Sequence, residues 1–227
     1  MDNELKVLAD NHKIEQLYNN NLFSVKSISE LLGTWESYSD SDKFSLENLT
    51  RRDSNINKNF TYQGGYDRNL TYGELSKSGV EELISGISKY KNITEKDVFV
   101  DIGSGTGKLI LHMGIKSSFK TLVGIEVQKE RHLYSKYIKE RILPENNSVF
   151  FLNKSILDFD LSIGTVFFMN DVSFSNELSN QIFDRLPFGS HFITHKNRTD
   201  CKILKEVLNL GVTWQNKKAT FNYYIKY

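Results

Sequence analysis

The chain has 227 residues, which is enough for one sizeable hydrophobic core or for a core domain with a small appendage. Hydrophobic residues make up 39% of it, a share typical of a globular fold rather than of a disordered chain. The 29 lysines and arginines nearly balance the 28 acids, and the net charge of +1 excludes a global basic field that would drive nucleic-acid binding. The charge is uneven, because residues 1–50 hold four lysines and nine acids.

Cysteine and apolar content limit the class of protein further. The single cysteine, Cys201, excludes an intrachain disulfide and a cysteine-based zinc site, and we expect no bound metal. No apolar run approaches the ~18 residues that a membrane span needs. The acidic first residues lack the apolar segment of a secretory signal. The sequence therefore predicts an intracellular protein without a membrane span.

The first 60 residues are predicted to form a helical N-terminal region that ends in a loop. Residues 1–35 carry apolar side chains at helical spacing and are expected to form two or three short helices. Residues 51–69 have almost no periodicity and are rich in Asn, Gly and Asp, which is typical of a loop. We expect a second, larger domain to occupy residues 61–227.

From Thr71 onward the sequence alternates between short apolar runs and amphipathic stretches. Strands are predicted at residues 97–102, 121–127, 149–153, 165–170 and 191–196. Helices are predicted at residues 74–90, 107–117, 128–142, 175–186 and 199–209. Residues 212–227 have the pattern of two strands joined by a polar turn. Because strand–helix alternation is typical of a parallel sheet covered on both faces, we predict a doubly wound sheet closed by an antiparallel hairpin.

A glycine-rich turn follows the first predicted strand, in the stretch VFVDIGSGTGKLIL at residues 98–111. Ligands of open α/β sheets lie beyond the carboxyl ends of the strands, and glycines leave room for them. The spacing is G-x-G-x-G rather than the G-x-G-x-x-G that suits a pyrophosphate, and the preceding Asp101 would repel a phosphate. An acid at this position suits a ligand with an amine. S-adenosylmethionine fits, because it carries an ammonium and a sulfonium but no phosphate.

Acids also follow the next two predicted strands. Glu126 ends the second strand, 19 residues after Gly107, where its carboxylate can accept hydrogen bonds from both hydroxyls of a ribose. Asp158 and Phe159 follow the third strand and could accept from an adenine amine and stack on its ring. Alone, each feature has a plain alternative: a tight turn, an exposed acid at a strand end, or a surface acid beside a core aromatic. Their order along the chain favours S-adenosylmethionine binding.

The end of the fourth predicted strand bears on the methyl acceptor. Enzymes that methylate amino groups of nucleobases or of glutamine typically have Asn or Asp followed by two prolines and an aromatic residue there. In this chain the strand ends FFMNDVSF, with Asn170 and Asp171 but without prolines. The sequence therefore disfavours a nucleobase as the acceptor.

Five motifs resemble, in the same order, those of the Disruptor-of-telomeric-silencing family: TYGEL at 71–75, FVDIGSGTGKLIL at 99–111, GIEV at 124–127, FFMNDVSF at 167–174 and VTWQNKKATFNYYI at 212–225. That family consists of histone lysine methyltransferases that use the seven-stranded, Rossmann-like class I methyltransferase sheet instead of the SET fold. The resemblance implies this α/β fold, methylation of a protein lysine from S-adenosylmethionine, and a histone or nucleosome as substrate. It also implies action in the nucleus of the source, or in the nucleus or cytoplasm of a host cell.

The resemblance further implies the residues of the site. Those expected at the cofactor are Tyr72, Gly73, Glu74, Asp101, Gly103, Ser104, Gly105, Gly107, Lys108, Glu126, Asp158, Phe159 and Asn170. Asn170 would also orient the incoming amine, and Phe168, Trp214 and Tyr223 would wall a narrow channel for the lysine. Such a channel would lower the pKa of the lysine, about 10.4 in water, and so favour the neutral amine. The alternative for the aromatic residues is packing of the hairpin on the sheet.

Three features depart from the pattern that the resemblance implies. Asp171 replaces a second asparagine, and is expected either to contact the charge of the substrate or to cap the next helix. Lys108 stands where the family usually has glutamine. Trp214 and Tyr223 are nine residues apart, two more than expected, so the tip of the hairpin is expected to differ.

The clusters of basic residues considered for DNA binding are all short, at 51–52, 195–198 and 217–218. Such clusters are more typical of a solvated surface than of a binding patch, so we expect weak or no direct nucleic-acid binding. Two other functions stay open: a methyltransferase of RNA or of a small molecule, and a methyltransferase-like binding module without turnover.

Overall fold

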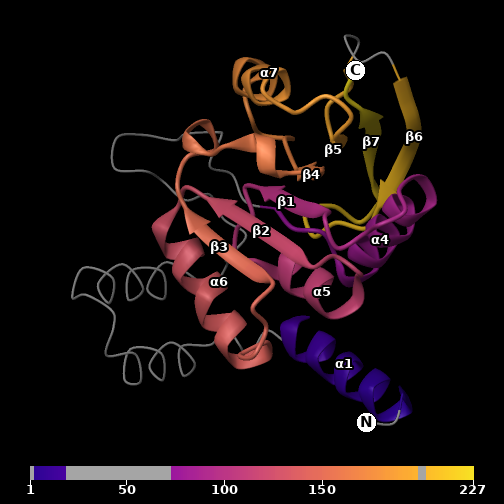
Figure 1. The fold of residues 1–227 in the computed structure, drawn as a ribbon, viewed down its shortest axis with the longest axis vertical. Coiled ribbons are helices and arrows are strands. Elements are labelled where there is room, and N and C mark those ends of the chain that lie inside the picture. Colours follow the sequence, from indigo (N-terminus) through magenta and orange to yellow (C-terminus); the bar gives the residue numbers. More distant parts are fainter. Residues whose placement is uncertain (1–2, 19–72, 199–202) are drawn as a thin grey trace.

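The computed structural model describes residues 3–18, 73–198 and 203–227 (Figure 1). At the N-terminal end, the described residues 3–18 form helix α1 (Asn3–Tyr18). The other helices expected in residues 19–35 and the loop expected at 51–69 lie outside the described residues, as does Tyr72. The division into domains at residue 60 therefore stays a prediction.

A seven-stranded sheet forms the centre of the molecule, in the order β3-β2-β1-β4-β5-β7-β6. Its strands are β1 (Val98–Ile102), β2 (Thr121–Glu126), β3 (Val149–Asn153), β4 (Val166–Met169), β5 (His191–Thr194), β6 (Ile203–Leu210) and β7 (Ala219–Ile225). The first five strands pair in parallel, and β7 lies antiparallel between β5 and β6. This arrangement confirms the predicted Rossmann-like sheet with a C-terminal antiparallel hairpin.

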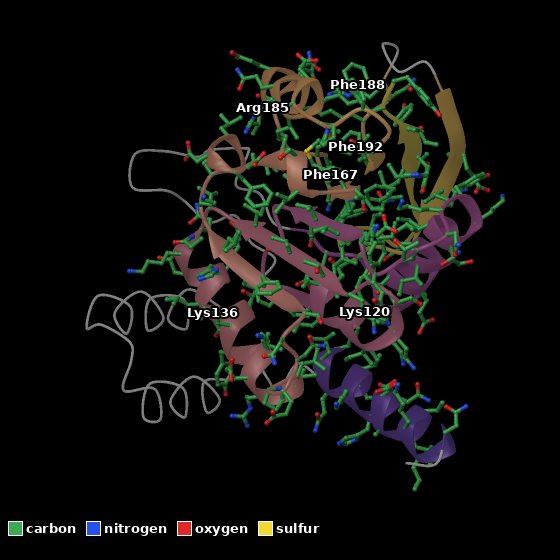
Figure 2. The ribbon with its side chains drawn as sticks, in the orientation of Figure 1. Lys120, Lys136, Phe167, Arg185, Phe188 and Phe192 are labelled. Carbon is green, nitrogen blue, oxygen red and sulfur yellow. The ribbon has the colours of Figure 1, made fainter. Side chains whose placement is uncertain are left out.

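Helices cover both faces of the sheet (Figure 1). The described residues form α4 (Lys77–Tyr90), α5 (Lys108–Lys116), α6 (Lys129–Ile142), α7 (Asn176–Asp184) and the short 3-10 helices η3 (Ile156–Asp158) and η4 (Leu161–Ile163). Because side chains alternate along a strand, Phe99 of β1 packs with α4, α5 and α6, whereas Val100 packs with α7 and the 3-10 helices. Figure 2 shows Phe167 and Phe192 in the second of these cores, between the sheet and α7.

The predicted helix at 199–209 is wrong, because residues 203–210 form strand β6. The hairpin consequently pairs β6 with β7, with Leu208 opposite Phe221, and residues 211–218 form the connection rather than a strand. Apolar residues of this segment also fit helical spacing, but from Val207 to Leu210 exposed and buried side chains alternate with the period of a strand. Pairing along the whole length of β7 stabilises the extended form.

Helix α1 packs on α5 and α6 (Figure 1). Ile14 and Leu17 are buried in this contact, and the hydroxyl of Tyr18 lies 3.0 Å from Nδ1 of His112. Burial lowers the pKa of His112 to about 4, so its imidazole is neutral in this pair at physiological pH.

Within residues 3–18, 73–198 and 203–227, no helix combines the length and the hydrophobicity needed to cross a bilayer.

Candidate functional site

A large cavity lies where the parallel strands end. Its volume is about 390 Å³, and it opens beside Ile102 of β1, Glu126 of β2 and Asn170 after β4. It is lined by Gly73, Ile102, Gly103, Ile125, Glu126, Val127, Arg131, Lys154, Ser155, Ile156, Asn170, Val172, Ser173, Phe174, Leu178 and Trp214. A smaller cavity, of about 30 Å³, shares Gly73, Gly103 and Asn170 with it. The two therefore meet at the switch point between β1 and β4, where ligands of such sheets bind.

The glycine-rich turn brings the backbone close to this cavity. Gly103, Gly105 and Gly107 all have positive φ angles, of 79°, 55° and 82°. The N–H groups of Gly103 and Ser104 both donate to the carbonyl of Ile125, at 2.9 Å, which fixes the turn against β2. A Cβ atom on Gly107 would lie 2.5 Å from Phe151, so glycine is required there for space as well as for conformation.

Glu126 is held in a fixed position at the cavity wall. Its Oε2 accepts from the N–H of Gly105 at 2.9 Å, and its Oε1 accepts from the N–H of Gln128 at 2.8 Å. Burial raises the pKa of Glu126, although the guanidinium of Arg131 and these N–H groups oppose the shift. Arg131 is a buried residue of α6 that also lines the cavity. The sequence did not predict it as a site residue, because nothing distinguishes it from the other charged residues of an amphipathic helix.

The small cavity gathers most of the charged residues that were predicted for the cofactor. Asp101, Glu74 and Lys108 line it together with Ser104 and Asn170. Burial, and after it the neighbouring Glu126 carboxylate, raises the pKa of Asp101 to about 8. A buried acid of this kind is stabilised in its charged form by a cation, so the cavity is suited to an ammonium group.

The segment that starts at Gly73 joins the glycine-rich turn to the connection between β6 and β7. The Glu74 carboxylate accepts from the hydroxyl of Thr106 and from Nζ of Lys108, both at 2.8 Å. The Glu74 carbonyl accepts from the N–H of Thr213 at 2.9 Å. A Cβ atom on Gly73 would lie 2.6 Å from the Trp214 ring, so Trp214 packs directly on this glycine.

Asn170 lies between the two cavities. Its Nδ2 donates to the carbonyl of Gly73 at 3.1 Å, while its Oδ1 is buried and has no hydrogen-bond partner among the described residues. The carbonyl of Gly73 thus fixes the orientation of the amide. An oxygen held in this way can accept a hydrogen bond from a group that enters the cavity.

The structure does not bring Asp158 and Phe159 to the cavity. Asp158 is exposed in η3, and Phe159 is buried in the core on the α7 side of the sheet. Their turn is held by Arg185, which donates to the carbonyls of Ile156 and Phe159 and is labelled in Figure 2. Ser155 and Ile156, which precede them, line the cavity instead. The aromatic residue on the cavity wall at this end is Phe174, which lies over Gly103.

The structure separates the three aromatic residues predicted for a lysine channel. Trp214 lines the large cavity and Phe168 lines the small one. Tyr223 lines neither, because it is fully buried and its hydroxyl lies 2.7 Å from Nδ1 of His191, at the opposite end of β5. Phe221, seven residues after Trp214, has the spacing expected of the family and packs on Phe168 with ring centroids 5.3 Å apart. The sequence reasoning missed it, although the spacing pointed to it.

We expect Tyr223→Phe to affect stability rather than activity. Loss of the hydroxyl leaves the buried His191 ring without this partner, which should lower the free energy of unfolding by about 1–2 kcal/mol. Denaturant unfolding would measure the loss, with Tyr227→Phe at the exposed C-terminal end as the control. A large loss of methyl transfer at unchanged stability would instead support the channel role predicted from the sequence.

Asp171 has a third role that neither sequence alternative described. It is fully buried, and its Oδ1 accepts from the Thr194 hydroxyl at 2.7 Å and from the N–H groups of His195 and Lys196. It therefore joins the ends of β4 and β5, whereas Ser175 caps α7.

In the basic cluster at 195–198, Arg198 donates to the carbonyl of Ser179 and is buried. That arginine serves the fold rather than an exposed binding patch.

Metal ligands do not cluster in the described part of the chain: no group there brings together three or more His, Cys, Asp or Glu side chains that could hold an ion. Eight of the predicted cofactor residues do converge on the two joined cavities: Gly73, Glu74, Asp101, Gly103, Ser104, Lys108, Glu126 and Asn170. The arrangement suits an organic ligand that carries an ammonium and hydroxyl groups.

Two solved structures that resemble this chain in fold are methyltransferases. An RNA methyltransferase from Salinibacter ruber, in complex with S-adenosyl-L-homocysteine, has a TM-score of 0.54 and 19% identity, over 67% of this chain and 92% of that one. Magnesium protoporphyrin IX methyltransferase from Synechocystis PCC 6803, with bound S-adenosylmethionine, has a TM-score of 0.54 and 9% identity, over 85% of this chain and all of that one. These likenesses confirm the class I methyltransferase fold.

Relatives that are similar in sequence indicate a narrower class of methyltransferase than the fold does. Proteins named "Histone-lysine N-methyltransferase, H3 lysine-79 specific" are 30% identical over 142 residues in Caenorhabditis elegans and 38% identical over 55 residues in Drosophila melanogaster. These matches cover 56% and 24% of this chain but only 15% and 3% of the relatives, so the chain spans a small part of their length. The family described as "Histone methylation protein DOT1" matches residues 54–222. The match extends over most of the sequence and includes both the glycine-rich turn and Asn170, and the chain therefore belongs to the DOT1 family.

Proposed function

We propose that the chain transfers a methyl group from S-adenosylmethionine to a lysine side chain of a histone-type protein. The observation that carries this proposal is the convergence of Asp101, Glu126 and Asn170 on the joined cavities of a DOT1-family fold. The relatives named as H3 lysine-79 specific enzymes support a histone as the acceptor. A histone substrate implies action at chromatin, in the nucleus of the source or of a host cell.

The polar groups of the cavities fit this cofactor. Glu126 and Asp101 line the cavities; Glu126 would accept hydrogen bonds from ribose hydroxyls, and Asp101 would face the ammonium of the methionine part. Ser104 Oγ and Asn170 Oδ1 are buried atoms without a hydrogen-bond partner among the described residues; the cofactor would satisfy the first and the incoming amine the second. Ser155 and Ile156 would flank the base.

The chemistry then depends mainly on positioning. When bound, the cofactor supplies an electrophilic methyl group on a sulfonium. The Asn170 amide, fixed by the carbonyl of Gly73, would accept a hydrogen bond from the incoming amine and align it. Trp214 and Phe168 would exclude water from the alkyl chain of the lysine and lower the pKa of its ammonium. No general base is assigned, because a lysine that arrives neutral needs only alignment.

The test is to incubate the pure protein with methyl-labelled cofactor and one acceptor in each of three separate reactions. The acceptors are histone octamers, nucleosomes and total cell lysate. We expect label on a histone lysine, located by mass spectrometry of the digested protein. Label found only on RNA or on small molecules would overturn the proposed acceptor. Binding of the cofactor without any transfer would favour a binding module that lacks turnover.

Glu126→Ala tests the ribose contact separately from the acceptor. Since it removes charge-assisted hydrogen bonds, we expect cofactor binding to weaken by about 1–3 kcal/mol, measured by calorimetry. Glu140→Ala, at an exposed position of α6, is the matched control and should bind normally. Unchanged affinity in Glu126→Ala would show that the ribose assignment is wrong.

A further inference from the structure

We propose that Lys108 and Ser104 form a carboxylate subsite in the small cavity, which makes the site of this chain selective for a cofactor with an intact amino-acid group. The inference deepens the proposed function and rests on it. It concerns the one cofactor position at which the chain carries a cation where the resemblance implies a neutral glutamine.

The small cavity carries both signs of charge. Asp101 and Glu74 line it as acids and Lys108 lines it as a cation. The methionine part of the cofactor is a zwitterion, with an ammonium and a carboxylate on one carbon atom. A wall with acids alone would attract the ammonium and repel the carboxylate, whereas this wall is complementary to both groups.

Contacts within the protein hold the Lys108 ammonium at the cavity. Its Nζ forms an ion pair with Glu74 at 2.8 Å, and both side chains are mostly buried, with 16% and 14% of their surface exposed. Glu74 is in turn fixed by the Thr106 hydroxyl at 2.8 Å and, through its backbone, by Thr213. Glu74 offsets the charge of Lys108 within this pair, but the ammonium has three donors and can also donate a charge-assisted hydrogen bond to a carboxylate that enters the cavity.

Ser104 supplies an independent indication of a ligand. The residue is 9% exposed, and its Oγ is buried without a hydrogen-bond partner among the described residues. A hydroxyl donates one hydrogen bond, and a carboxylate is a strong acceptor for it. Lys108 is also the first residue of α5, whose N-cap, Gly107, offers no side-chain cap, so the start of this helix favours an anion as well.

The experiment compares two ligands by calorimetry: S-adenosylmethionine and decarboxylated S-adenosylmethionine, which lacks only the carboxylate. We expect the wild-type protein to prefer the intact ligand by roughly 10–100-fold, the range for a charge-assisted hydrogen bond. Lys108→Gln should reduce the preference to below about threefold, chiefly by weakening the intact ligand. Ser104→Ala should reduce it in part, and Lys108→Arg, which keeps the charge, should preserve it.

Equal binding of the two ligands by the wild type, or equal weakening of both by Lys108→Gln, would overturn the subsite. The second result would mean that Lys108 only holds Glu74 in place. Thermal unfolding of each variant shows whether it is folded, and Lys108→Arg separates loss of charge from loss of packing. If the wild type binds both ligands equally, only the subsite fails. If it binds neither ligand, the proposed function fails as well, so the two failures are distinguishable.

Discussion

Asp101→Asn is expected to weaken cofactor binding strongly while making the ligand-free protein more stable. The side chain is buried beside Glu126, and its pKa is raised to about 8, so its charged form is unfavourable in the folded state. Asparagine keeps the shape without that cost, and we expect the free energy of unfolding at pH 8 to rise on the order of 2–4 kcal/mol. Removing the charge opposite an ammonium should weaken cofactor binding by about 2–4 kcal/mol.

The pH dependence of this gain has a definite sign. Between the ordinary pKa of the carboxyl, 3.8, and its folded pKa of about 8, the folded protein binds more protons than the unfolded one. Asp101 therefore lowers stability progressively as the pH rises through that window, and the gain from Asp101→Asn should be largest at pH 8 and vanish near pH 4. Unfolding by urea at several pH values measures it.

Asp97, directly before the start of β1, provides a matched control with the opposite sign. Burial opposes its ionisation, but an ion pair with Lys91 at 2.8 Å and hydrogen bonds from Thr94 outweigh burial and lower its pKa to about 2. Its contribution to stability is present above pH 4 and is lost as the pH falls towards 2. Asp97→Asn should therefore destabilise the protein at neutral pH. Equal destabilisation by both variants would contradict the account of Asp101.

Cofactor affinity should depend on pH for the same reason. At pH 6 Asp101 is protonated in the ligand-free protein, so binding of the ammonium must release that proton. We expect affinity to rise up to about pH 8 and then to fall as the α-amino group of the cofactor, with a pKa of about 7.7–8.0, loses its charge. Affinity that is constant from pH 6 to pH 8 would argue against Asp101 as the ammonium contact.

Asn170→Ala is expected to lower kcat by about 100-fold or more, because a misplaced nucleophile loses roughly that factor. The cofactor should still bind, since Asp101 and Glu126 are unchanged. The variant removes both the hydrogen bond to the carbonyl of Gly73 and the unpartnered Oδ1. Single-turnover methyl transfer to the histone substrate measures the loss, and calorimetry measures the binding.

Asn209→Ala, at an exposed position of β6, is the matched control and should keep full activity. A loss of cofactor binding in Asn170→Ala equal to the loss of turnover would mean that Asn170 acts on the cofactor rather than on the amine. A kcat close to that of the wild type would remove Asn170 from the mechanism.

The parallel part of the sheet could be predicted because each strand is a short apolar run between polar turns. The register of the C-terminal hairpin could not, since residues 203–210 carry apolar side chains that satisfy both a helical and an extended pattern. Only pairing with β7, a contact between distant parts of the chain, decides between them.

Some residues of the site could likewise be predicted from the sequence, and others could not. Asp101 and Glu126 could be placed from sequence because each stands at the end of a strand, and parallel strands end at one edge. Asp158 and Phe159 lie three residues or more beyond the turn at Ser155, and the 3-10 helix η3 directs them away from the cavity. Tyr223 and Phe221 both face inward from β7, and only the position of Phe168 shows which of them is next to the site.

A crystal structure with S-adenosylhomocysteine, the product left after methyl transfer, would show whether the joined cavities hold the cofactor. We expect density there, with the ribose on Glu126, the ammonium at Asp101 and the carboxylate beside Lys108. An empty cavity at saturating ligand, or a nucleotide phosphate bound in its place, would contradict it.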